Sequence, residues 1–219
     1  MDSKSVNKAI REIIKPILEE NGFTQFTARS AWRYRNNRID VINFQSFNSY
    51  LADSIGCTTY SFSVNLGCFL LYIPDKKWIK AKDDILNPPE YSCHLRGRLF
   101  RTYEQKELDR KDIWYIDPKG SYLSKSLEDV RRQIEEKAFP WYACLASDVE
   151  ILHILKENDE NKILWGFGNN PSPKRSFITA YVALHLDQKA LAKQKINEVI
   201  RSGCYSNLLD ELKKTENGL

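Results

Sequence analysis

The chain is poor in the residues and spacings that metal and redox sites require. It has 219 residues, of which three are histidines and five are cysteines scattered along the sequence. It has no C-x-x-C pair and no short spacing between cysteine and histidine of the kind that zinc sites use. We therefore expect reduced, mostly buried thiols, and we expect the protein to bind no metal and no cofactor.

Long apolar runs, a secretion signal and a phosphate-binding loop are also missing. The longest apolar stretch, around residues 66–73, is far shorter than the ~18–20 residues that cross a bilayer. The first ten residues, MDSKSVNKAI, lack the order of charged, apolar and small residues of a secretory signal. Gly166-Phe167-Gly168 has neither the third glycine nor the preceding strand of a phosphate loop, so it is typical of a turn-rich linker. These absences predict a cytoplasmic protein that does not bind membranes.

The overall charge shows no strong imbalance. The chain has 33 basic and 29 acidic residues, and this excess is too small to indicate a nucleic-acid partner by itself. Hydrophobic residues make up 42% and aromatic residues 12%, which is typical of a folded globular protein. Arginines nevertheless gather without any acidic residue in two stretches, residues 29–38 and 94–101. Both stretches are candidates for contact with an anion.

The spacing of apolar residues predicts an α+β fold. Apolar residues three and four apart predict a helix from about Ser5 to Asn21, and Pro16 should kink it. A period of two then predicts strands at 31–35, 39–46, 58–72, 92–101 and 113–116, with a loop and a short helix near residues 78–85. We expect an antiparallel sheet of four or five strands that packs one face on the N-terminal helix and is followed by a helical C-terminal part.

The change from strand to helix patterns divides the chain after residue 122. We assign residues 1–122 to an α+β sheet domain and residues 123–219 to a helical C-terminal region packed on it. Ser172-Pro173 and Asp187 are typical helix starts and predict a helical hairpin at residues 172–202. One such hairpin resembles a unit of helical-repeat proteins but is not an array, so we favour a helical cap that completes the core.

Several short motifs are shared with a known family. They are IIKPIL at 13–18 followed by Gly22-Phe23, VINFQ at 41–45 and FSVNLG at 62–67, with HLRGRL at 94–99 as a weaker one. By these motifs the chain resembles a bacterial family known only as a domain of unknown function, over roughly residues 5–145. The resemblance implies a shared fold, but it assigns neither an activity nor functional residues.

One face of the predicted sheet is polar. The alternation of side chains along the second and third strands gathers amides and hydroxyls on the face opposite the helix. These candidate ligand-binding residues are Asn43, Gln45, Ser61, Ser63 and Asn65. Such groups can donate to and accept from a ligand or a peptide backbone. The alternative, which we favour, is a face that is solvated or covered by the C-terminal helices with its polar groups bonded internally.

Two pairs of arginines are the second candidate site. Arg33 and Arg35 share one face of a predicted strand, next to aromatic residues, and Arg96 and Arg98 share a face of another. Interleaved arginine and aromatic residues are used by nucleic-acid-binding proteins for phosphate contact and base stacking. Runs of basic residues are, however, more often solvated faces or members of ion pairs.

His94 completes the candidate residues. Its neighbour Cys93 projects to the opposite face of a strand, so the two do not form a thiol–imidazole pair. A catalytic arrangement at this position would need a further partner, such as His153 or His185 from the helical region. His185 falls on an apolar helix face, where a core histidine is the simpler interpretation.

We recognise no catalytic constellation and lean towards a protein without enzymatic activity. The leading hypothesis is an intracellular binding protein whose partner is another protein, of the immunity or toxin-neutralising kind by analogy with other small bacterial domains. The alternative is an RNA- or DNA-binding module that uses the arginine patches on the sheet. The sequence leaves the oligomeric state open.

Overall fold

The structure is a computed structural model that describes residues 1–74, 81–82, 85–157 and 172–219. The chain forms two compact units. The first unit contains Met1–Phe69 and Ile79–Trp141, and the second contains Leu70–Trp78 and Tyr142–Leu219. Residues 123–141, which the sequence pattern assigned to the helical region, thus belong to the unit that contains the sheet.

A five-stranded antiparallel sheet forms the centre of the first unit, as predicted. Its strands run in the order β1 (Gln25–Phe26), β2 (Ser30–Arg35), β3 (Arg38–Ser46), β4 (Phe62–Leu70) and β7 (Leu95–Arg98). In the β2–β3 hairpin Ala31 lies opposite Ile42 and Arg33 lies opposite Asp40, so these four residues share one face. The prediction of a strand at 113–116 was wrong, because this segment joins β4 only through a bridge between Phe62 and Trp114. The fifth strand is β1, at the other edge.

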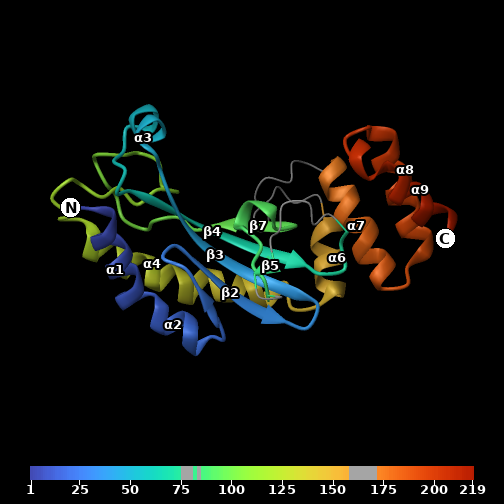
Figure 1. Ribbon diagram of the computed structural model, residues 1–219, viewed down its shortest axis with the longest axis horizontal. Coiled ribbons are helices and arrows are strands. Elements are labelled where there is room, and N and C mark those ends of the chain that lie inside the picture. Colours follow the sequence, from blue (N-terminus) through green and yellow to red (C-terminus); the bar gives the residue numbers. More distant parts are fainter. Residues whose placement is uncertain (75–80, 83–84, 158–171) are drawn as a thin grey trace. The chain divides into compact units, whose positions relative to one another are not determined.

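Two helices replace the single N-terminal helix, α1 (Ser3–Ile13) and α2 (Lys15–Glu20). Asp2 caps α1 by accepting from the backbone N–H of Ser5 at 2.7 Å. Pro16 has no N–H to continue the ladder, so the helix is interrupted at Ile14 and restarts with proline in its first turn, as predicted. The buried stripe faces the sheet, with α4 (Leu123–Gln133) packed beside α1 (Figure 1). The stripe consists of Val6, Ile10, Ile14, Ile17 and Leu18.

The connections between the strands contain elements that the pattern did not predict. The helix α3 (Ser49–Ile55) links β3 to β4, with Asn48 as its N-cap and Gly56 in a left-handed conformation after it. Between β4 and β7, Ala81–Lys82 (β5) pairs with Ile85–Leu86 (β6), and a 3-10 turn covers Glu90–Ser92. The short helix predicted near 78–85 falls partly on residues outside the described ones, and the described part of that range belongs to the β5–β6 pair.

A long loop, residues 99–122, joins β7 to α4 and is held by two buried charged groups. The carboxylate of Asp129 accepts from the backbone N–H of Thr102 at 3.1 Å and from the indole N–H of Trp114 at 3.0 Å. The guanidinium of Arg101 donates to backbone carbonyls within the loop, including that of Ile113 at 3.3 Å. These bonds fix a segment without regular structure against the sheet, with Trp114 stacked on Phe62.

Helices make up the second unit. They are α6 (Asp148–Lys156), α7 (Pro173–His185), α8 (Lys189–Ser202) and α9 (Leu209–Asn217). A π-helical turn (Ile134–Ala138) and α5 (Phe139–Cys144) connect α4 to α6 along the chain, and a 3-10 turn (Ser206–Leu208) precedes α9. α7 and α8 pack against each other around a turn in which Asp187 has a φ of 55°. The turn-rich linker predicted around Gly166 lies outside the described residues. In the described part of the chain, no helix has the length and apolar character to span a membrane.

Candidate ligand-binding pocket

The serines and Asn65 of the predicted polar face are buried beneath the loop of the same unit. Ser61 accepts from the backbone N–H of Ile116 at 3.1 Å, and Ser63 donates to the carbonyl of Asp112 at 2.7 Å. Asn65 is 1% exposed and accepts from the guanidinium of Arg98 at 2.8 Å. These polar groups are therefore bonded internally, and residues 112–116 of the loop cover them.

The two remaining polar residues lie nearer the surface. Asn65 donates to the side-chain oxygen of Gln45 at 2.8 Å, and Gln45 itself is exposed. Asn43 is half-buried and donates to the hydroxyl of Ser30 at 2.9 Å. The five residues thus do not form one open polar surface.

Arg33 and Arg35 point to the helix-facing side of the sheet and pair with one carboxylate. Asp40 is 0% exposed and lies 2.8 Å from Nη2 of Arg33 and 2.6 Å from Nη2 of Arg35. Arg33 also donates to the carbonyl of Asn21 at 3.0 Å. The pair of arginines therefore compensates a buried charge and ties β2 to the end of α2.

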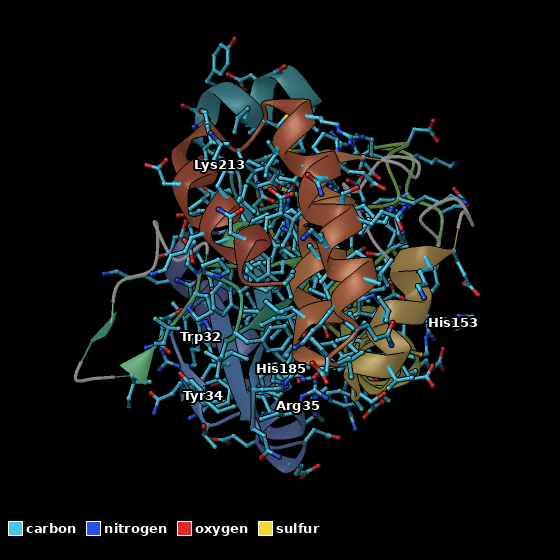
Figure 2. All side chains as sticks on the ribbon, turned by 90° about the vertical axis from the view of Figure 1, so that its right-hand side faces the viewer. Trp32, Tyr34, Arg35, His153, His185 and Lys213 are labelled. Atoms are coloured by element: carbon cyan, nitrogen blue, oxygen red, sulfur yellow. The ribbon has the colours of Figure 1, made fainter. Side chains whose placement is uncertain are left out.

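The aromatic neighbours of these arginines are labelled in Figure 2. The indole N–H of Trp32 donates to the carbonyl of Pro88 at 2.8 Å, and the hydroxyl of Tyr34 donates to the side chain of Asn87 at 2.5 Å. Trp32 is buried, whereas Tyr34 is 38% exposed. The two rings thus hold the 87–89 segment on the sheet face opposite Arg33.

Arg96 and Arg98 also pair with carboxylates, on the face opposite that of Arg33. Arg96 forms a two-pronged ion pair with Glu90, with nitrogen–oxygen distances of 2.7 and 3.0 Å. Arg98 lies 2.6 Å from the carboxylate of Asp112. The four predicted arginines therefore lie on two faces of the sheet and do not form a single basic surface.

Of the three histidines, His94 lies in the first unit, where it is 6% exposed and its ring lies 4.4 Å from that of Phe69. The other two belong to the second unit (Figure 2). His153 pairs with Glu157 on the surface of α6. The interpretation of His185 as a core residue was wrong: its side chain is 43% exposed and stacks on Tyr72 at 4.2 Å.

The sequence pattern did not predict a pocket that the structure contains in the first unit. A pocket of about 340 Å³ lies between the α1–α2 pair and the strands β1 to β3. Its apolar walls are Ile10, Ile14 and Leu18 from the helices and Phe26, Ile42 and Phe44 from the strands. Its basic residues are Arg11, Lys15 and Arg29, and no acidic residue lines it among the described residues. We call it the basic pocket.

Arg29 enters the pocket from the tight turn between β1 and β2. The turn is fixed because the N–H of Thr27 donates to the carbonyl of Ser30 at 2.8 Å, and the N–H of Phe44 donates to the carbonyl of Arg29 at 2.7 Å. The Arg29 side chain is half-buried, and its Nη1 atom is fully buried with no hydrogen-bond acceptor among the described residues. Burial lowers the pKa of this guanidinium below the ordinary value for arginine.

The other two basic residues of the pocket differ in exposure. Arg11 is exposed on α1. Lys15 is half-buried, with its ammonium 3.2 Å from Glu19 and 5.1 Å above the ring of Phe26. Because Glu19 already balances Lys15, the excess positive charge of the pocket resides mainly on Arg29 and Arg11.

The basic side chains of the pocket can bind a negatively charged group. Its two hydroxyl groups are already engaged: that of Thr27 accepts from the N–H of Ser30 at 3.0 Å, and that of Ser30 accepts from Asn43. No histidine, cysteine or carboxylate lines it among the described residues. Within the described parts of both units, no three His, Cys, Asp or Glu side chains come together as a metal site.

A helical layer on an antiparallel sheet, with the basic pocket between them, defines an α+β sheet domain followed by a helical extension. The family model described as "Domain of unknown function (DUF4304)" matches residues 14–143, more than half of the chain. The protein belongs to this family, which confirms the expected resemblance to a domain of unknown function. No curated protein and no solved structure matches the chain. The matched range includes Arg29, Lys15 and all five strands of the sheet.

Proposed function

We propose that this chain is a binding protein without catalytic activity, and that the basic pocket receives a negatively charged group of its ligand. The observation that carries the proposal is the guanidinium of Arg29, whose buried Nη1 has no acceptor in the described part of the chain. A buried donor without a partner costs about 1–3 kcal/mol, more if it is charged. A ligand carboxylate or phosphate would remove that cost once a rotation of the Arg29 side chain brings this donor to the wall of the pocket.

The contrast with the other arginines of the sheet supports this choice. Arg33, Arg35, Arg96 and Arg98 each have a carboxylate within hydrogen-bond distance. Arg29 lies on the same hairpin as Arg33 and Arg35 but has no acidic side chain beside it in the pocket. Guanidinium groups form strong two-pronged bonds with carboxylates and phosphates, so an external anion is the natural partner.

Titration of the full chain with sodium acetate and with inorganic phosphate, followed by ¹H–¹⁵N NMR, tests the proposal. Saturable shifts are expected at the amides of residues 27–31, and they should be absent in Arg29→Met. Arg131→Met is the matched control, because Arg131 is 45% exposed on α4 and lies outside the pocket. Shifts that never saturate, or that persist unchanged in Arg29→Met, would overturn the proposal.

For the biological setting, we propose that the chain acts inside the cell as an immunity or toxin-neutralising protein that binds another protein. The nucleic-acid alternative has less support, because the four arginines on which it rests are engaged in ion pairs. It predicts retention of RNA or DNA in a low-salt mobility assay and a steep loss of binding with salt.

A further inference from the structure

We infer that the ligand of the basic pocket is a small amphipathic monoanion, a carboxylic acid with an apolar body. This inference rests on the proposed function and adds the chemical class of the ligand. The volume of about 340 Å³ lies at the lower end of the range for small-molecule sites. It corresponds to roughly a dozen water volumes, and therefore to a ligand of on the order of ten to fifteen non-hydrogen atoms.

The exposures of the side chains that line the pocket favour a molecule with a charged head and an apolar tail. Arg11 is exposed, Arg29 is half-buried, and the walls at Ile14 and Ile42 are 0% and 1% exposed. A carboxylate held by Arg29 leaves the rest of the ligand among apolar side chains. Burying apolar ligand surface there supplies affinity, while the guanidinium fixes the orientation of the head.

The few polar groups of the pocket favour a ligand whose body is apolar. The hydroxyls of Thr27 and Ser30 each already accept a bond from the protein, and they are the only side-chain hydroxyls among the described residues that line the pocket, so they offer few further bonds to a sugar or a second polar group. Arg29 is the partly buried guanidinium of the pocket and has no acidic partner among the described residues, whereas Arg11 is exposed to solvent and Lys15 pairs with Glu19, so the interior of the pocket matches one negative charge. A monocarboxylate fits this arrangement better than a nucleotide with several charges and hydroxyls.

Isothermal titration calorimetry of the full chain with straight-chain carboxylates from butanoate to decanoate tests the inference. The dissociation constant should fall about fourfold per added methylene, until the chain fills the pocket at roughly eight to ten carbons. The alcohol of the same length should bind roughly tenfold more weakly, because it lacks the charge-assisted bond to Arg29. Arg29→Met should abolish the difference between acid and alcohol, whereas Arg131→Met should preserve it. Arg29→Gln serves as a second variant should Arg29→Met not fold.

The other outcomes separate the inference from the proposed function. Equal affinity for acetate, decanoate and phosphate, dependent on Arg29, would overturn the amphipathic ligand and leave an anion-binding site. Binding of an acetylated Glu-Phe-Glu tripeptide amide at Arg29 without binding of any alkanoate would overturn it in favour of a polypeptide partner. Absence of binding by every one of these anions would overturn both the inference and the proposed function.

Discussion

Replacing Arg29 with methionine is expected to stabilise the ligand-free protein. Its Nη1 atom is buried without an acceptor among the described residues, and the side chain as a whole is half-buried. An unmet buried donor costs about 1–3 kcal/mol, and partial exposure of the group places the gain from its removal near the lower limit, ~1 kcal/mol. Methionine is of similar length, is apolar and adapts to the space beside Ile42 and Phe44.

Urea denaturation followed by tryptophan fluorescence measures this gain. Three of the five tryptophans, Trp32, Trp114 and Trp141, belong to the first unit, so the signal reports mainly on the unit that contains the pocket. With a denaturant slope of about 2–3 kcal/mol per molar, a gain of ~1 kcal/mol raises the midpoint by about 0.3–0.5 M. The slope itself should not change.

Arg33→Met is the matched control, because it makes the same substitution four positions along the hairpin. Arg33 shares the fully buried Asp40 with Arg35, and its loss leaves that carboxylate with less compensation. Breaking such a buried pair costs about 3 kcal/mol, so the midpoint should fall by about 1 M. A fall of the midpoint in Arg29→Met as well would show that Arg29 is a structural residue and would refute the reasoning.

Three further predictions concern other parts of the fold. Gly67→Ala places a Cβ atom 2.6 Å from the sulfur of Cys93 and should cost about 1–3 kcal/mol, seen as a lower urea midpoint; an unchanged midpoint would show that Cys93 moves freely. Arg175→Met removes donors to the carbonyls at the end of α6, at 3.1 Å for Leu155, and should speed amide hydrogen exchange in the second unit while that of β2 and β3 stays unchanged. Although burial acts to raise it, hydrogen bonds and charge from Arg110 and Arg98 hold the pKa of Asp112 below 3.8. Its stabilisation is therefore full at neutral pH and is lost as the pH falls from about 4 downwards, so Asp112→Asn should destabilise the protein more at pH 7 than at pH 2.

The sequence pattern predicted the longer elements, which are helices of several turns or strands of several residues that bury one face. The N-terminal helix and its interruption at Pro16 followed from the apolar stripe, and β3 followed from its alternation. β1 has two residues and α3 has seven, which is too short for a period to be recognised. The segment at 113–116 alternates like a strand. It nevertheless forms a loop over the polar face, because Ile116 donates to the hydroxyl of Ser61 and Trp114 forms a single bridge with Phe62.

The predicted polar and arginine sites show why periodicity could not locate the pocket. The alternation of side chains along each strand correctly predicts which residues share a face with Arg33 or with Asn65. It does not predict which residue of a neighbouring strand or loop each of them contacts. The register that sets Arg33 opposite Asp40, and the loop that covers Ser63, arise only from tertiary structure. Arg29 belongs to the arginine-rich stretch noticed in the sequence, but its position in a turn follows no period. The absence of an acidic side chain beside it in the pocket is visible only in the folded chain.

The side-chain N–H signal of Arg29 in ¹H–¹⁵N NMR spectra, followed during titration with octanoate, tests the central claim most directly. We predict a saturable shift of this signal, with a dissociation constant that agrees with calorimetry, and no comparable shift of the Arg131 signal. Binding of octanoate that leaves the Arg29 signal unchanged would contradict the claim that this guanidinium receives the charged group of the ligand.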